Sequence, residues 1–246
     1  MLGLGNSIAC GGTLDAAFDI NSISSLINWY KNKTGVTEDS GVSAWADQSS
    51  SGNDLSQGNS TYRPTYTSAT GAVGYVGSGG DHLIMDSEIS LGALTAIYVL
   101  DMNISGSSDF FGIAQGDDAG NYIQLYGVTG DIYGYITGDN GTTSDGTGAT
   151  GLNPDAEDGV KFIYTITKSA ASSATVKFYH NTTLSATDTD FDANVPVALK
   201  YIGYEETPGR THNGNIYEIA FFNAELSSDD LTAVLTDMAD RNGITL

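Results

Sequence analysis

Short runs in which apolar and polar residues alternate, separated by Gly, Asn, Asp and Ser, are the main pattern along this chain. Runs of this length between turn-forming residues are typical of β-strands. Because no helical pattern separates them, the expected fold is all-β, a sandwich of two antiparallel sheets. The predicted strands are 26–30, 72–76, 82–85, 95–104, 109–115, 122–126, 132–137, 160–167, 175–179, 199–204 and 215–222.

One predicted strand shows the alternation most clearly, and two other segments lack it. Within 160–167, apolar residues alternate with polar ones, which predicts a strand with one buried and one exposed face. The segments 47–70 and 138–151 lack such periodicity. The second is rich in Gly, Thr and Asp and is long enough to form a functional or mobile surface loop.

One segment near the C-terminus has a helical pattern. Ser227 or Ser228 can cap its start, and Gly243 can end it. Its apolar residues fall three or four positions apart and form one stripe that should pack on the sandwich. This stripe consists of Leu231, Val234, Leu235 and Met238.

The chain is expected to be one domain preceded by an arm. Sandwiches of about 200–250 residues commonly fold as single domains, and this chain has 246 residues. Residues 1–16 are rich in glycine and lack periodicity. We therefore expect an extended N-terminal arm at 1–18 and a single domain at 19–246.

The charge of the chain excludes several classes of partner. Acidic residues number 30 against 9 basic ones, so the formal net charge is -21. Nucleic acids and anionic membranes require clusters of Lys and Arg, which nine scattered basic residues do not supply. No apolar run approaches the ~20 residues of a membrane span. The first lysine is Lys31 and the only cysteine is Cys10, so neither an ordinary secretory signal nor an internal disulfide framework is expected.

Several motifs resemble laminin-G-like, concanavalin A-like jelly rolls. Residues 26–31 (LINWYK) are followed by the turn 45–54 (WADQSSSGND), and 214–228 (GNIYEIAFFNAELSS) resembles the last strand of that family and its lead into a closing helix. Arg63-Pro64 and the stretch 79–83 match two further landmarks, so the resemblance covers about 20–246. It implies a jelly-roll fold and leaves the function open, because this fold occurs in lectins, hydrolases and structural modules.

A second resemblance concerns the arm. Residues 1–7 (MLGLGNS) and the small residues after them are similar to the start of virion proteins of tailed bacteriophages, especially marine ones. This resemblance implies a location on a virion assembled in the host cytoplasm, with other virion subunits as partners. Leu2, Leu4 and Ile8 would then dock onto a neighbouring subunit, and the chain could form a homo-oligomer.

The sequence gives a poor case for catalysis. Glycosidases of this fold need two carboxylates facing one cleft, about 5–5.5 Å or ~6.5–9.5 Å apart. None of the seven glutamates begins an E-x-D-x-x-E motif, and Glu205 and Glu206 would point to opposite faces of a strand. The three histidines are far apart in the sequence, and no G-x-S-x-G motif occurs. We therefore expect no catalytic residues and no organic cofactor.

Asp47 and Asp54 have two interpretations. Hard oxygen ligands suit calcium, and relatives of this fold often bind calcium at the rim of the sandwich, so either residue could bind one ion. The favoured alternative is that these aspartates form turns by accepting hydrogen bonds from nearby backbone amides.

Tyrosines form the most suggestive pattern. Tyr122, Gln124 and Tyr126 share one face of their strand, while Tyr133 and Tyr135 share one face of the next. A hairpin turn near 127–130 would bring these faces together, with the aliphatic residues on the core side. The tyrosines either fill the concave side of the sheet against 138–151 or bind a sugar or a protein. A subunit contact is favoured over a sugar, because no acidic cluster is evident beside these strands.

These observations favour a non-enzymatic virion surface protein, either a capsid decoration or a tail-associated protein, that displays a lectin-like jelly roll. The alternative is a carbohydrate-binding adhesion module that contacts host-surface glycans. A glycoside hydrolase is less favoured than either, because the required carboxylates are missing.

Overall fold

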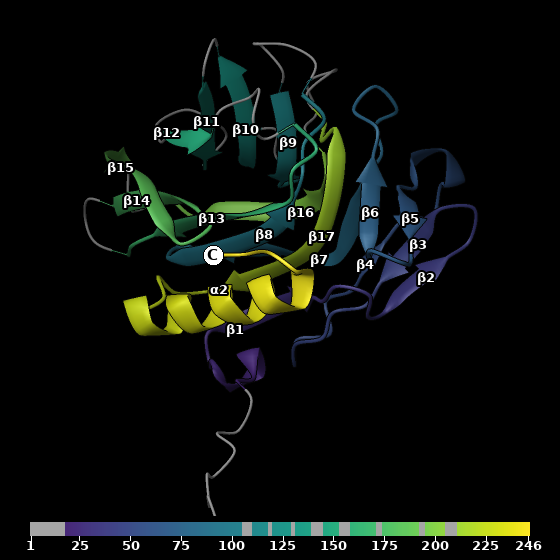
Figure 1. The fold of residues 1–246 in the computed structure, drawn as a ribbon, viewed down its shortest axis with the longest axis horizontal. Coiled ribbons are helices and arrows are strands. Elements are labelled where there is room, and N and C mark those ends of the chain that lie inside the picture. The colour runs from purple at the N-terminus through teal and green to yellow at the C-terminus, as the bar shows by residue number, and fades with distance from the viewer. Residues whose placement is uncertain are drawn as a thin grey trace, which may run out of the picture.

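In the part of the chain that the structure describes, the protein is a two-layer β-sandwich with one α-helix against an outer face (Figure 1). The computed structural model describes residues 18–104, 110–117, 120–128, 131–138, 145–152, 158–170, 174–191, 195–204 and 211–246. All pairings between the named strands are antiparallel, so the predicted antiparallel sandwich is confirmed.

The first sheet, sheet A, has eight strands in the order β15-β14-β13-β8-β17-β6-β5, with β1 also paired to β17. A short 3-10 helix, η1, precedes it at Ile20–Ser22. The strands of sheet A are β1 Leu26–Tyr30, β5 Thr65–Thr67, β6 Ala72–Tyr75, β8 Leu94–Leu100, β13 Phe162–Lys168, β14 Ala174–His180, β15 Thr183–Phe191 and β17 Gly214–Phe222.

The second sheet, sheet B, has nine strands in the order β12-β11-β10-β9-β16-β7-β4-β3-β2. A second 3-10 helix, η2, lies at Ser60–Tyr62. The strands of sheet B are β2 Val36–Glu38, β3 Val42–Trp45, β4 Leu55–Ser56, β7 Leu83–Leu91, β9 Phe110–Gln115, β10 Tyr122–Val128, β11 Asp131–Thr137, β12 Asp145–Leu152 and β16 Val197–Ile202.

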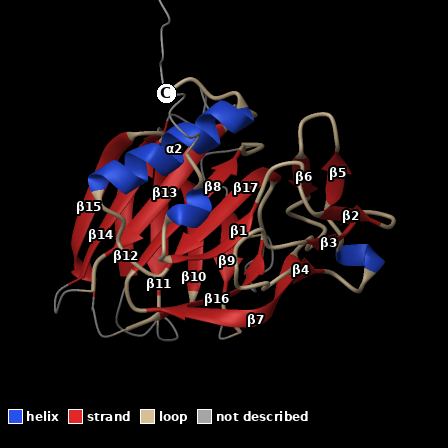
Figure 2. Cartoon of the chain, turned by 90° about the horizontal axis from the view of Figure 1, so that it is seen from below, coloured by secondary structure: helices blue, strands red, loops and turns tan. Residues whose placement is uncertain are grey.

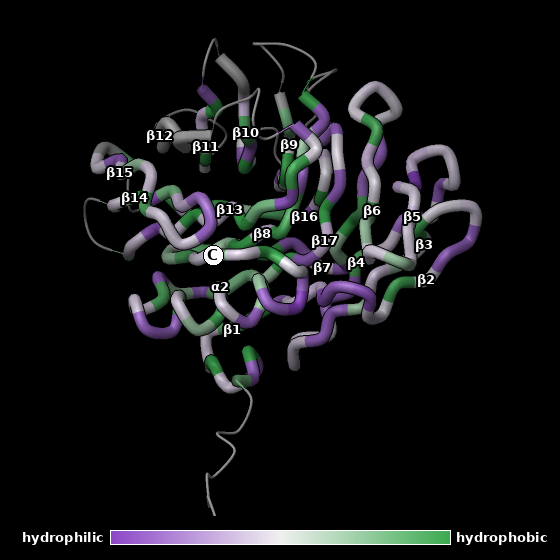
Figure 3. The backbone as a smooth tube through the Cα atoms, in the orientation of Figure 1, coloured by the Kyte–Doolittle hydropathy of each residue, from purple (hydrophilic) through white to green (hydrophobic). Residues whose placement is uncertain are grey.

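Two hydrophobic clusters hold the layers together. The larger one lies between the sheets, and the hydrophobic residues of β8, β13 and β17 stand out in Figure 3. The smaller one lies on the outer face of sheet A, where helix α2 (Ser228–Asn242) crosses the strands (Figure 2). Among the described residues, no helix has both the length and the apolar character needed to cross a membrane.

Helix α2 begins and ends as the sequence predicts. The hydroxyl of Ser227 accepts a hydrogen bond from the backbone N–H of Asp230 at 3.1 Å. Gly243 follows the helix with φ 68°, a left-handed conformation that glycine adopts without strain. The predicted apolar stripe is confirmed, since Leu231, Val234, Leu235 and Met238 are all buried.

Three predictions from the strand pattern were wrong. Every residue of β13 is buried, because α2 covers the outer face that was expected to meet solvent. Part of the segment expected to be a loop at 138–151 forms β12, which pairs with β11. The prediction also missed the short strands β2 to β5 and the polar edge strand β15.

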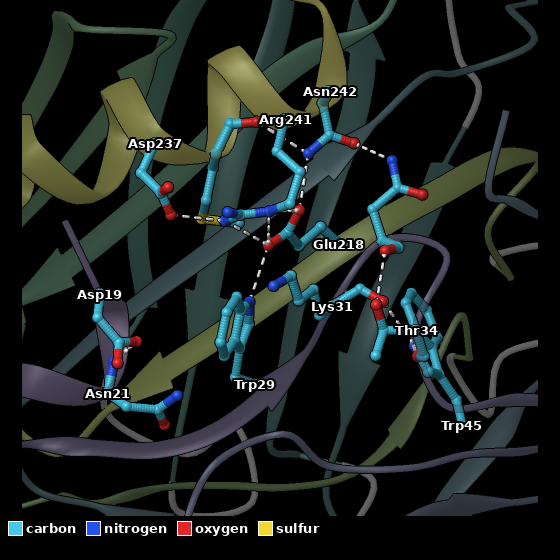
Figure 4. Close-up of polar contacts among 12 residues, drawn as sticks. Asp19, Asn21, Trp29, Lys31, Thr34, Trp45, Glu218, Asp237, Arg241 and Asn242 are labelled. Atoms are coloured by element: carbon cyan, nitrogen blue, oxygen red, sulfur yellow. Dashed lines mark hydrogen bonds and ion pairs between the residues drawn. The ribbon is translucent and has the colours of Figure 1, made fainter. Parts of the chain in front are cut away.

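A buried carboxylate fixes α2 to sheet A (Figure 4). Glu218 on β17 is fully buried and accepts a hydrogen bond from Trp29 Nε1 at 2.8 Å. From the helix, Arg241 Nη2 donates to the same carboxylate at 2.9 Å and Asn242 Nδ2 at 2.7 Å. Because these donors surround the buried carboxylate, Glu218 has a structural role.

Candidate binding face

The hairpin of β10 and β11 forms the predicted tyrosine face. The register pairs Tyr126 with Tyr133 and Gln124 with Tyr135. As expected, the aliphatic residues between them point into the core and are fully buried, while the tyrosines on the other side are partly exposed. We call the set Tyr122, Gln124, Tyr126, Tyr133 and Tyr135 the tyrosine face.

The four tyrosine rings stack in two pairs and restrict one another's orientation. Tyr122 stacks on Tyr135 with ring centroids 5.6 Å apart and an interplanar angle of 17°. Tyr126 stacks on Tyr133 at 5.5 Å and 27°, and its edge meets the ring of Tyr135 at 6.4 Å. Rings held in this way lose little conformational entropy when a ligand covers them.

Polar atoms without partners lie on the same face. Gln124 is only 4% exposed, and its Oε1 has no hydrogen-bond partner within the described parts of the chain. Thr137 follows Tyr133 and Tyr135 on the same side of β11, and its Oγ1 is equally buried and unpartnered there. Both atoms lie below the surface, where an unpaired polar atom costs about 1–3 kcal/mol.

A second aromatic group, which the sequence did not predict, surrounds His82. Its ring stacks on Tyr62 at 5.6 Å and 29° and lies 4.9 Å from the ring of Tyr204. Tyr201 of β16 completes the group, 6.0 Å from His82 and 5.5 Å from Tyr204. We call Tyr62, His82, Tyr201 and Tyr204 the His82 cluster.

The His82 cluster and the tyrosine face lie on the same side of sheet B. On β9, Gln115 pairs with Tyr122 of β10 on one side and with Tyr201 of β16 on the other. Residues paired directly across strands point to the same face of a sheet. From β11 to β7 there are four strand spacings of about 4.8 Å, so the strands that carry the two aromatic groups span about 19 Å.

Charged groups border the His82 cluster. Asp117 accepts hydrogen bonds from Lys200 Nζ at 2.8 Å and from Tyr201 Oη at 3.1 Å. Its backbone N–H donates to Glu88 Oε2 at 2.7 Å. The hydrogen bond from Lys200 lowers the pKa of Asp117 below its usual value. The structure thus places two carboxylates on this side of the sheet, where the sequence gave no sign of an acidic cluster.

Asp47 acts as a turn former. Burial opposes ionisation of its carboxylate, yet hydrogen bonds from Ser51, Trp29 and Ser49 outweigh burial and lower its pKa. In total the two oxygens accept six hydrogen bonds. Asp54 Oδ1 accepts from the backbone N–H of Asp47 at 2.8 Å. Within the described ranges, no group of three or more His, Cys, Asp or Glu side chains could hold a metal ion.

The predicted docking residues of the arm, Leu2, Leu4 and Ile8, lie outside the described residues. The described part of the chain starts at Phe18. Ile20 is buried in the smaller hydrophobic cluster together with Leu231 and Leu235 of α2. The chain therefore enters the domain on the α2 side of the sandwich, opposite the tyrosine face (Figure 1).

Comparison with solved structures shows that the fold is a jelly-roll, lectin-like sandwich. The ligand-binding domain of botulinum neurotoxin serotype D, solved with N-acetylneuraminic acid, matches 87% of this chain with a TM-score of 0.60 and 18% identity. The binding domain of Paraclostridial Mosquitocidal Protein 1 matches 89% with a TM-score of 0.59 and 10% identity. A heptameric pentraxin from Limulus polyphemus matches 63% with a TM-score of 0.52 and 13% identity, and 75% of the pentraxin is covered.

The similarity covers only part of each toxin domain. The chain spans about half the length of the toxin domains, 51% of the first and 53% of the second. No family model and no curated protein sequence matches this chain. At these identities the comparison establishes the fold, and the three matched proteins are two binding domains and a pentraxin.

Proposed function

We propose that this chain is a lectin-like module that binds glycans through the tyrosine face. The observation that carries the proposal is the pair of stacked tyrosine couples, Tyr122 with Tyr135 and Tyr126 with Tyr133, around the buried amide of Gln124. Aromatic rings offer an apolar surface to the C–H face of a sugar, and their hydroxyls hydrogen-bond to its hydroxyl groups.

The structural neighbours support glycans over a protein subunit as the ligand. One neighbour was solved with N-acetylneuraminic acid bound, and another toxin binding domain was solved with SialylT. The carboxylates of Asp117 and Glu88, which border the His82 cluster on the same side of sheet B, weaken the argument that had favoured a subunit contact. We therefore prefer the carbohydrate-binding alternative to the structural role that the sequence favoured.

Binding without catalysis is part of the proposal. Glycoside hydrolysis needs a protonated carboxylic acid near neutral pH, which requires a raised pKa. Asp117, which borders the His82 cluster, has a lowered pKa because Lys200 hydrogen-bonds to it, whereas burial raises the pKa of Asp81, next to His82. Glu218 is enclosed on the opposite side of the molecule, between sheet A and α2.

The proposal is tested on a glycan array, followed by calorimetric titration of the best ligand. Replacing Tyr126 or Tyr133 with Ala should weaken binding at least about tenfold each, the equivalent of ~1.4 kcal/mol. Tyr66→Ala is the matched control, because this partly exposed tyrosine lies on β5 of the other sheet. An array without any bound glycan, or Tyr126→Ala and Tyr133→Ala variants that bind like the native chain, would refute the proposal.

A role on a virion surface is a second candidate, supported by the arm sequence and by the position of Ile20. Because the chain enters the domain on the α2 side, docking by the arm and glycan binding would use opposite sides of the sandwich. Deleting residues 2–12 should abolish incorporation into particles while the unfolding midpoint stays unchanged. Light scattering on the full chain and on a variant beginning at Asp19 would show whether the arm also forms a homo-oligomer. Unchanged incorporation would exclude docking by Leu2, Leu4 and Ile8.

A further inference from the structure

We infer that the tyrosine face and the His82 cluster are two ends of one extended site for an uncharged glycan chain, which is recognised along its length instead of at a terminal sugar. This inference rests on the proposed function and adds the class of ligand. Its basis is the register that places Tyr122, Gln115 and Tyr201 in one row across sheet B.

The width of the aromatic surface sets the size of the ligand. Strand β11, which carries Tyr133 and Tyr135, and strand β7, which His82 directly precedes, are four strand spacings apart, about 19 Å. A single sugar cannot contact both ends of such a surface. An oligosaccharide laid across the strands would stack on the tyrosines at one end and on the His82 cluster at the other.

The His82 cluster has the features of a sugar platform in its own right. Tyr62 is 41% exposed while its ring stacks on His82, so it offers an ordered apolar surface to solvent. His82 Nδ1 lies 2.8 Å from the carbonyl oxygen of Gly80, which can only accept a hydrogen bond. Nδ1 therefore carries the hydrogen, the orientation of the ring is fixed, and Nε2 of the neutral ring is the acceptor.

Hydrogen-bonding groups for sugar hydroxyls border this platform. A β-bulge between Leu199 and Tyr201 lets Lys200 and Tyr201 both reach Asp117 on the outer face. The carboxylates of Asp117 and Glu88 offer acceptors, and Lys200 offers a donor. An aromatic ring next to a fixed carboxylate can hold the apolar face and the hydroxyl edge of the same sugar.

The charge distribution around the site favours an uncharged glycan as the ligand. Two carboxylates, Asp117 and Glu88, face one ammonium group, Lys200, and Asp117 already pairs with that ammonium at 2.8 Å. The whole chain carries a formal charge of -21. Polyuronates and sialylated glycans would meet repulsion from both the local and the overall charge.

The test is a calorimetric titration of the full chain with neutral oligosaccharides of increasing length, from one to six sugars. The series are cello-, laminari-, malto-, manno- and xylo-oligosaccharides. Affinity for one series should rise at least about tenfold between the disaccharide and the longest member. Tyr62→Ala should remove that gain and leave disaccharide binding at the tyrosine face unchanged. Tyr201→Phe keeps the aromatic ring and should keep most of the increase in affinity with length. Tyr201→Ala removes the ring and should lose that increase.

The outcomes separate this inference from the proposed function. Affinity that does not change with the length of the oligosaccharide would refute the extended site and leave the tyrosine face as the binding site. The same conclusion follows if Tyr62→Ala and Tyr201→Ala bind the longest oligosaccharide like the native protein while Tyr126→Ala does not. Tighter binding of polyuronate or sialylated chains of equal length would refute the preference for uncharged ligands. No binding in any series, charged or neutral, would refute both proposals. Tyr66→Ala and the unfolding midpoint of each variant control for folding.

Discussion

Gly134 of β11 lies directly beneath the hydroxyl of Tyr164, which belongs to the opposite sheet. A Cβ atom at position 134 would be 2.4 Å from Tyr164 Oη and 2.6 Å from Cδ1 of Phe178. The neighbours of Gly134 in sequence are Tyr133 and Tyr135, whose side chains point outward. The position of the tyrosine face therefore depends on a close approach between the two sheets at a residue without a side chain.

Gly134→Ala should destabilise the fold by about 1–3 kcal/mol, because the added methyl group overpacks the core. Denaturant titration measures this change in the free energy of unfolding. The matched control is Gly92→Ala, since a Cβ there would meet no atom within 4 Å. Adding Tyr164→Phe to Gly134→Ala should recover part of the loss, because it removes the closest contact; purely additive effects would contradict this explanation.

Arg241→Ala should destabilise the chain by about 3 kcal/mol, because it removes the cationic partner of a fully buried carboxylate, Glu218. Asp237→Ala removes the other acid that Arg241 contacts, at 2.7 Å within the same helix turn. That ion pair is partly exposed, so its loss should cost less than about 1 kcal/mol. Equal effects of the two substitutions in denaturant titrations would show that Glu218 does not anchor α2.

His212 should make the protein less stable in mild acid. Burial lowers its pKa from 6.5 to about 4, although the negative charge of Asp101 works in the opposite direction. The unfolded chain then binds a proton at higher pH than the folded chain, so stability falls as the pH decreases from about 6.5 to about 4. The loss is on the order of 3 kcal/mol.

Replacing His212 with Phe tests this mechanism. Neither ring nitrogen has a hydrogen-bond partner within the described residues, and the ring packs edge-on against Tyr75 and Phe111. An apolar ring should therefore be tolerated at pH 7. The free energy of unfolding of the variant should change less than that of the native chain between pH 7 and pH 4.5. An equal change in both proteins would assign the acid sensitivity to other groups.

Asp47→Ala should cost about 3 kcal/mol, because six hydrogen-bond donors lose their acceptor in a partly buried turn. The pKa of Asp47 is lowered in the folded state, so its stabilisation is complete above about pH 4 and is lost as the pH falls through the folded pKa. Asp86→Ala, at an exposed neighbouring position, should change the free energy of unfolding by less than about 0.5 kcal/mol.

Calcium should not change the unfolding midpoint of the native chain, because both oxygens of Asp47 already accept hydrogen bonds from the turn. Thermal unfolding with added calcium and with a chelator measures this directly. A calcium-dependent rise that Asp47→Ala or Asp54→Ala abolishes would instead assign these aspartates as metal ligands.

The local parts of this structure could be predicted from the sequence. Alternation alone placed Tyr126 and Tyr133 on one face and Ile123 in the core, because side chains of a strand point to opposite faces in turn. The limits of α2 followed from Ser227 and Gly243, whose effects depend only on nearby backbone groups.

The parts that depend on distant contacts could not be predicted. Ile163 is buried because α2, which begins more than sixty residues later, packs on it. The His82 cluster joins residues from three separate segments, so nothing near His82 in the sequence signals its partners. Strand β12 lacks apolar alternation and is defined by its pairing with β11.

Both ends of the domain lie on the same side of the sandwich. Ile20 and Ile244 pack into the cluster around α2, on the outer face of sheet A, whereas the tyrosine face belongs to sheet B (Figure 1). Anything joined to the domain near Ile20 or Ile244 would be separated from a ligand on the tyrosine face by the full thickness of two sheets. If the tyrosine face binds a glycan as proposed, an attachment at either end of the domain and the ligand would therefore contact opposite sides of the sandwich and would not compete for the same residues.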